Sequence, residues 1–216
     1  MSAREEVLGR VRAALVDVPE TDPAADVPIE WEYARPTAMP DVLARFMDMC
    51  ADYKATVARC DEGSLADRVA ELLGSAGVRS VVLPSGMEQP WRQAIEAAGI
   101  TVHDDDPPLS RAELDAIDGV VTAAAVGIAE TGTIVLDHAS DQGRRALTLV
   151  PDTHLVVVRA DQVVSDVPEA VLRLADAVAE GAPLTWISGP SATSDIELSR
   201  VEGVHGPRNL LVILAG

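Results

Sequence analysis

Residues 64–83 have the sequence SLADRVAELLGSAGVRSVVL, and this stretch decides the fold class. Its apolar residues first recur at the spacing of one helix face, as Leu65, Val69, Leu72 and Leu73. Gly77 then stands where helices commonly end. A short apolar run over 80–83 follows, which is typical of a strand buried on both faces of a sheet. The stretch therefore predicts a helix over 64–76 and a strand over 80–83.

The same alternation continues on both sides of this unit. Ser110 and Glu113 form a capping-box pattern at the start of a further helix. The remaining predicted elements of this half are helices over 3–16, 41–53, 89–98 and 110–117 and strands over 55–59, 100–103 and 119–125. Strand–helix–strand units repeated this often predict a parallel sheet with right-handed crossovers.

The second half of the chain has more closely spaced strands. We predict them over 133–137, 154–159, 162–164, 184–187 and 210–214, with a helix over 167–179. The predicted fold class is therefore α/β, an open and mostly parallel sheet flanked by helices, with a mixed extension. Residues 1–40 are predicted to be an N-terminal arm, helical and then proline-rich and extended, in which Trp31 and Tyr33 anchor the chain to an apolar surface or to another subunit. Residues 41–216 form the predicted domain.

Composition excludes several classes of partner. The chain has 35 acidic and 17 basic residues, a net charge of −18, which repels nucleic acid and anionic membranes. A small anionic ligand would need a local pocket of positive potential. Only two cysteines, Cys50 and Cys60, are present, and the first residues do not resemble a secretory signal. We predict a cytoplasmic protein with reduced cysteines, and the sequence is compatible with an oligomer.

The first candidate site is the segment GIAETGT at 127–133. It follows a predicted buried strand, so we expect it at a strand end, where open α/β sheets bind ligands. Its glycine spacing resembles a phosphate loop, but Thr133 occupies the position where that motif needs lysine. Glu130 is the candidate nucleophile or general base, or alternatively a residue that satisfies turn amides. The candidate ligand-binding residues here are Gly127, Thr131, Gly132 and Thr133.

Two later segments are also candidates. GPSATSDIE at 189–197 offers hydroxyl groups and backbone amides that could form an anion-binding nest, or alternatively a turn that leads into a capped helix. GVHGP at 203–207 places His205 between small residues, where it either polarises a carbonyl or serves as an ordinary hydrogen-bonding residue. The candidate ligand-binding residues of these segments are Gly189, Pro190, Ser191, Asp195 and Gly206.

The sequence predicts no metal site. His103, His138 and His154 lack metal-ligand spacing, and the run at 104–106 favours a solvated loop over a calcium loop. No dinucleotide-binding glycine motif is present, so we predict no cofactor in this chain. Arg144 and Arg145 follow a predicted turn; they either add positive charge to the site or lie at the surface, the simpler account.

The order of GIAETGT, the stretch LVPDTHLVV at 149–157, GPSATSDIE and GVHGP resembles the LUD domain, over roughly residues 42–216. The short form without cluster-binding cysteines is similar to the C-type branch of that family. The resemblance implies a fold like that of the NagB/RpiA/CoA-transferase group. It also implies a role in oxidation of L-lactate to pyruvate beside two partner subunits, at least one of which carries iron–sulfur clusters.

Two functions follow from this resemblance. In the favoured one, the chain is a non-redox subunit of the lactate-oxidising system, because nothing in its sequence supplies an electron acceptor. In the alternative, it is a stand-alone enzyme, similar to a CoA transferase or isomerase, that acts on a small carboxylate, CoA ester or sugar phosphate. Glu130 would then be the nucleophile or base and His205 its polarising partner.

Overall fold

The computed structural model describes residues 2–17, 36–190, 192–193, 201–202 and 206–216, in two compact units. The first unit, Met1–Arg35, contains helix α1 (Ala3–Ala14), which begins with the capping box of Ser2 and Glu5 and has no buried residue. The predicted extended segment with Trp31 and Tyr33 lies mostly outside the described residues. The second unit, Pro36–Gly216, contains all the elements described below.

The central element is a six-stranded sheet in which every neighbouring pair is parallel, in the order β1-β12-β7-β4-β2-β3. The strands are β1 (Thr56–Cys60), β2 (Ser80–Leu83), β3 (Thr101–Asp104), β4 (Gly119–Thr122), β7 (Thr153–Arg159) and β12 (Asn209–Ala215). The longest strands, β7 and β12, lie side by side in the middle of the sheet, with His154 opposite Leu210 in the register. This confirms the predicted α/β class with a mostly parallel sheet.

A second, mixed sheet of four strands has the order β8-β5-β6-β9. Its strands are β5 (Val126–Ile128), β6 (Thr133–Leu136), β8 (Val163–Val164) and β9 (Thr185–Ile187). β6 is antiparallel to both β5 and β9, whereas β5 and β8 are parallel. A separate two-stranded ribbon pairs β10 (Ala192–Thr193) with β11 (Val201–Glu202).

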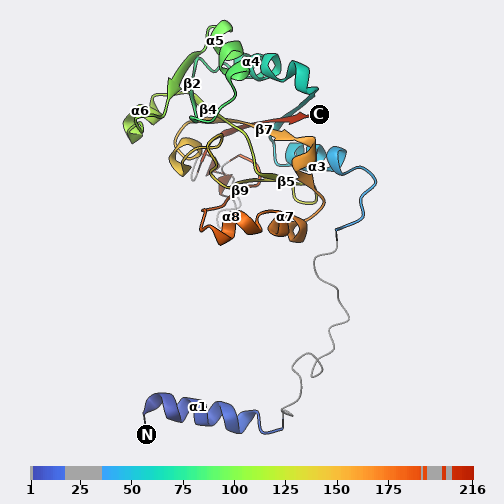
Figure 1. Ribbon diagram of the computed structural model, residues 1–216, viewed down its shortest axis with the longest axis vertical. Coiled ribbons are helices and arrows are strands. Elements are labelled where there is room, and N and C mark those ends of the chain that lie inside the picture. The colour runs from blue at the N-terminus through green and yellow to red at the C-terminus, as the bar shows by residue number, and fades with distance from the viewer. Residues whose placement is uncertain (1, 18–35, 191, 194–200, 203–205) are drawn as a thin grey trace. The chain divides into compact units, whose positions relative to one another are not determined.

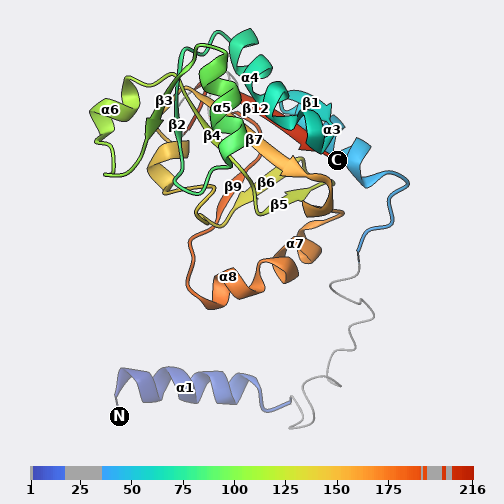
Figure 2. The same cartoon turned by 45° about the horizontal axis from the view of Figure 1, so that its top comes forward.

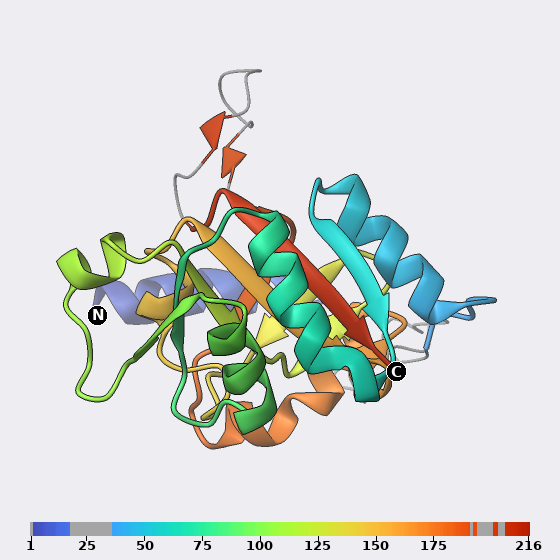
Figure 3. The ribbon, with the colours of Figure 1, turned by 90° about the horizontal axis from the view of Figure 1, so that it is seen from above.

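Helices cover both sheets. α4 and α5 lie on one face of the six-stranded sheet, the second sheet lies below its opposite face, and α7 and α8 follow beyond β5 and β9 (Figures 1 and 2). Seen from above, α4 and α5 run across the central strands (Figure 3). The helices of this unit are α3 (Val42–Asp52), α4 (Leu65–Ser75), α5 (Gln89–Ala97), α6 (Arg111–Asp115), α7 (Val167–Arg173) and α8 (Ala175–Ala179), with short 3₁₀ turns η1 (Glu62–Ser64), η2 (Arg145–Thr148) and η3 (Ala160–Gln162).

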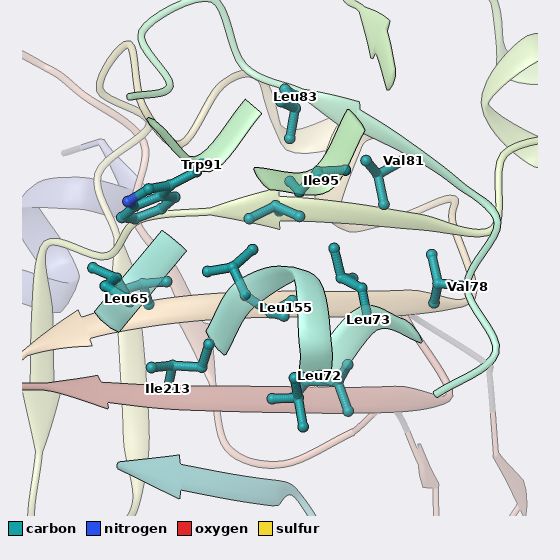
Figure 4. Packing of buried hydrophobic residues seen from close by; sticks show 14 of the residues in the cluster. Leu65, Leu72, Leu73, Val78, Val81, Leu83, Trp91, Ile95, Leu155 and Ile213 are labelled. Carbon is teal, nitrogen blue, oxygen red and sulfur yellow. The ribbon is translucent and has the colours of Figure 1, made fainter. Parts of the chain in front are cut away.

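The core has two main parts, one on each face of the six-stranded sheet. Alternate residues of β7 point to opposite faces, as strand geometry requires. Leu155 and Val157 pack with the α4 and α5 side chains, among them Trp91 and Ile95 (Figure 4). Val156 and Val158 instead pack with α3 and with the second sheet. The low aromatic content is compatible with this core because branched aliphatic residues fill both faces.

The structure corrects two predicted elements. The strand predicted over 119–125 ends at Thr122: Ala123 then donates its amide to the Asp141 carbonyl and Ala125 donates to Val135, and β5 of the second sheet begins at Val126. These bonds lead the backbone away from β4 and into the second sheet. The helix predicted over 167–179 is interrupted at Leu174, whose φ/ψ of −90°/2° departs from helical values. The predicted mixed extension is thus a separate sheet.

Candidate functional site

A cavity of about 220 Å³ lies at the amino ends of β7 and β12. Arg145 and Thr148 of η2 line it, together with His154 from β7. Residues of β9 and those after it, Leu210 of β12 and the residues before β12 complete the lining. Open α/β sheets usually bind ligands at the carboxyl ends of their strands, so this cavity lies at the opposite end from the one that the sequence led us to expect.

Arg145 gives the cavity its positive charge. The Nη1 group donates to the Thr148 carbonyl at 3.3 Å and to the Thr148 hydroxyl at 3.1 Å, which holds the guanidinium against η2. Among the residues that the structure describes, no carboxylate forms an ion pair with Arg145 and none lines the cavity. The remaining guanidinium donors are therefore available to an anionic ligand.

His154 is a buried, neutral imidazole on the cavity wall. It is 1% exposed, and its Nε2 lies 2.8 Å from the hydroxyl oxygen of Thr122. Burial lowers the pKa of His154 to about 3, and the positive charge of Arg145 lowers it in the same direction. The ring is therefore a neutral hydrogen-bonding group at physiological pH, and Arg145 carries the positive charge of this wall.

A chain of hydroxyl groups connects the GIAETGT segment to the cavity. Thr131 donates its hydroxyl hydrogen to Thr133 at 2.8 Å, and the Thr133 hydroxyl lies 2.8 Å from that of Ser188. Each hydroxyl has a single hydrogen. Because Thr133 already accepts from Thr131, its own hydrogen can be donated to Ser188. The Ser188 hydrogen is then free to point at a ligand in the cavity that Ser188 lines.

Thr185 is oriented by a second histidine. His138 Nδ1 lies 2.7 Å from the Gly143 carbonyl, which can only accept, so Nδ1 carries a hydrogen. In the neutral ring, Nε2 must then accept from the Thr185 hydroxyl, 2.8 Å away. Thr185, which lines the cavity, therefore presents its lone pairs as acceptors there. The cavity thus offers a cation, a hydroxyl donor and a hydroxyl acceptor.

The structure places Glu130 outside the cavity. Glu130 is exposed in the turn between β5 and β6, with its amide donating to the Ser165 carbonyl. The two glycines around it serve packing: a Cβ on Gly127 would lie 3.1 Å from Phe46, and one on Gly132 would lie 2.6 Å from the backbone of Met49. The acid–base role of Glu130 stays a prediction, without a described cavity group beside it.

Of the later candidates, Gly189, Pro190 and Gly206 line the cavity. Ser191, Asp195 and His205 lie outside the described residues. The structure therefore brings together parts of all three candidate segments, with the GIAETGT segment reaching the cavity wall through Thr133 and Ser188.

Of the two ionisable residues of the cavity, sequence reasoning missed His154 and named Arg145 only as a residue that adds charge to the site or lies at the surface. An imidazole at the start of the apolar run LVVV was a usable signal, because a polar residue in a buried strand needs a reason. Arg145 had no such signal. Arg145 is exposed as well as lining the cavity, which agrees with the surface account, whereas Arg144 is partly buried: it donates to Asp105 through Nε and Nη2, each at 2.7 Å, and to the Leu109 carbonyl.

The predicted solvated run at 104–106 is exposed at Asp104 and Asp106, and this ion pair corrects the prediction at Asp105. The Asp105 side chain is only 11% exposed, and its hydrogen bonds from Arg144 lower its pKa. The two-point contact fixes the loop before α6 to the residue that precedes η2. Arg145 is therefore held in place from its N-terminal side by a charged pair.

The two cysteines are free thiols. Cys50 is buried, which raises its pKa to about 12, and its Sγ donates to the Gly132 carbonyl at 3.5 Å. Cys60 is half-buried at the end of β1. Within the described part of the chain, no group of three or more acidic, histidine or cysteine side chains could hold a metal ion. No helix in the same residues has the length and apolar character needed to cross a bilayer.

The fold is α/β, and its cavity is lined by residues of both sheets and by Arg145. The chain belongs to the LUD domain family, whose model matches residues 43–215. It is 48% identical over 215 residues to lactate utilization protein C of Deinococcus radiodurans, covering 99% of this chain and 96% of that protein. It is also 31% identical to uncharacterized protein YkgG of Escherichia coli, over 75% of this chain and 74% of that one.

A solved structure supports the fold. The crystal structure of a DUF162 family protein from Deinococcus radiodurans superposes with a TM-score of 0.72 at 46% sequence identity. The match covers 84% of this chain and all of that chain.

Proposed function

We propose that this chain takes part in lactate utilization as a non-redox subunit of a cytoplasmic, iron–sulfur-dependent system that oxidises L-lactate to pyruvate. The observation that carries the proposal is the 48% identity to lactate utilization protein C, which extends over nearly the whole of both chains. A relative so named in Geobacillus kaustophilus is 26% identical over 86% of this chain, which supports the same assignment.

The cysteine content supports the division of labour. Oxidation of lactate releases two electrons that an acceptor must take up. The whole chain contains two cysteines, whereas common iron–sulfur clusters use four. One of them, Cys50, is a buried thiol of raised pKa, which disfavours the thiolate that metals bind. The clusters of the proposed system are therefore assigned to partner subunits.

The alternative of a stand-alone transferase or isomerase has less support. That reaction would need Glu130 beside the bound substrate, and Glu130 does not line the cavity. A covalent or general-base step needs its carboxylate within hydrogen-bonding distance of the reacting group. The geometry therefore favours a subunit that binds a ligand over one that attacks it.

The test is reconstitution of lactate-dependent dye reduction by the candidate iron–sulfur partners, with and without this chain. We expect the rate to rise when the folded chain is added and to stay at its basal value with the same chain after heat denaturation. The variant Glu130→Gln should restore the rate as well as the wild type does. Equal rates with and without the chain would overturn the proposal, and turnover by the isolated chain that Glu130→Gln abolishes would favour the alternative.

A further inference from the structure

We propose that the cavity between η2 and β9 is a binding site for a small monocarboxylate, held by Arg145 and by the hydroxyl of Ser188. The inference rests on the proposed function and adds to it the location of the binding site: the carboxylate binds to the subunit that carries no iron–sulfur cluster. The sequence had indicated Arg145 only as one of two alternatives, charge for the site or surface exposure, and it had not indicated Ser188.

Charge selects the class of ligand. Arg145 is the charged side chain among the described residues that line the cavity, and His154 beside it is neutral. A single guanidinium matches one carboxylate, to which it can donate two parallel hydrogen bonds. A second negative charge on the ligand would have no counterpart on this wall, and the net charge of −18 on the chain would oppose it.

Hydroxyl groups favour an acid with one further oxygen. Ser188 can donate a hydrogen because the chain from Thr131 through Thr133 satisfies its oxygen. Thr185 is left as an acceptor by His138, so it can receive a ligand hydroxyl. A hydroxy acid therefore finds a partner for its carboxylate and for its hydroxyl group.

Volume agrees with a small ligand. The cavity of about 220 Å³ has room for a three-carbon acid such as lactate or pyruvate, since a single water molecule takes up only about 30 Å³ in the liquid.

The experiment is calorimetric titration of the purified full chain with L-lactate and pyruvate. Lactamide, which keeps the shape of lactate without its charge, and succinate, which has two charges, are the matched ligands. We expect L-lactate or pyruvate to bind measurably more tightly than lactamide and succinate do. In Arg145→Gln its Kd should rise on the order of 10- to 100-fold, the loss expected for a charge-assisted contact. Ser188→Ala should raise the Kd by roughly 3- to 10-fold.

Arg173→Gln is the control, because Arg173 is an exposed arginine of α7 that does not line the cavity. Its Kd should match that of the wild type. Absence of binding by either monocarboxylate, equal binding of lactamide, or an unchanged Kd in Arg145→Gln would overturn the inference. If the chain restores lactate-dependent dye reduction but binds no monocarboxylate, this site is contradicted and the proposed function stands. If it binds a monocarboxylate but does not restore dye reduction, the site stands and the proposed function is contradicted.

Discussion

The hydroxyl oxygen of Thr133 lies 2.8 Å from that of Ser188, although the two residues are 55 positions apart in the chain. Thr133 is the buried first residue of β6, and Ser188 directly follows β9. The pairing of these two antiparallel strands brings the hydroxyls together. A segment that does not line the cavity thereby controls the direction of a hydrogen on its wall.

Replacing Thr133 tests this control. Thr133→Val keeps the side-chain shape but removes the donor, so the Ser188 oxygen loses the hydrogen bond that sets the direction of its own hydrogen. We expect the Kd for the bound monocarboxylate to rise by roughly 3- to 10-fold, the value of one neutral hydrogen bond. Thr133→Ser, which restores the hydroxyl, should recover most of the affinity. Similar Kd values for the two variants in calorimetric titration would contradict a role for this hydroxyl.

His154 makes folding stability dependent on pH. Its folded pKa of about 3 lies below the ordinary value of 6.5, so between these values the unfolded chain binds a proton that the folded chain does not. The free energy of unfolding should therefore be unaffected by His154 above pH 6.5 and fall as the pH is lowered toward 3. The slope from this residue is at most about 1.4 kcal/mol per pH unit.

Urea denaturation of the wild type and of His154→Gln, measured at pH 7, 6 and 5, checks this prediction. The Thr122 hydroxyl is hydrogen-bonded to the ring, and Arg145 is the charged group that acts on it. We expect a shallower loss of stability in the variant. Parallel curves for the two proteins would show that His154 is not the titrating group.

The ion pair of Asp105 and Arg144 does not line the cavity, but it should affect how tightly the cavity binds a monocarboxylate. Asp105→Asn weakens the two-point contact that fixes the residue before η2, and we expect a loss of about 1 kcal/mol in the free energy of unfolding. Arg145 would be held less firmly, so the Kd for the monocarboxylate should rise a few-fold. Asp106→Asn, at an exposed neighbour, is the control; equal effects of both variants on the Kd would contradict the coupling.

Gly132 is required by a close approach of the backbone. Its φ is +59°, and an added Cβ would lie 2.6 Å from the backbone of Met49 in α3. Gly132→Ala should therefore lower the free energy of unfolding by about 2–4 kcal/mol, from backbone strain and overpacking together. Gly181 has a φ of +79° and open space around it, so Gly181→Ala isolates the strain at about 1 kcal/mol. Equal losses in thermal or urea unfolding would argue against the steric account.

Local patterns predicted most of the elements of this fold. The strand over 80–83 coincides with β2, and Ser110 and Glu113 form the capping box at α6. These predictions succeeded because the signals are local: a helix face, a terminal glycine and a cap are each complete within a few residues. The strand that begins at Gly119 was predicted too long for the opposite reason, since its end at Thr122 depends on the hydrogen bond from the Ala123 amide to the carbonyl of Asp141, which is distant in the sequence.

The candidate site could be predicted only in part. Gly189, Pro190 and Gly206 come from glycine-rich segments that interrupt apolar strands, which is a visible signal. Arg145 could be named only as one of two alternatives, because the sequence does not show that η2 and β9 line the same cavity. The distinction between Arg144, which pairs with Asp105, and Arg145, which faces the cavity, depends on contacts with segments far away in the sequence.

The position of β12 has a consequence for how the chain is made. β1 has its hydrogen-bonded neighbour in β12, which pairs Thr56 with Leu211, about 150 residues later. At translation rates of about 5–20 residues per second, β1 is synthesised roughly 10–30 seconds before that neighbour. During this interval the nascent β1 presents an unpaired strand edge, which is a site for association with other chains. Efficient production of this protein should therefore depend on the cell's chaperones at the ribosome.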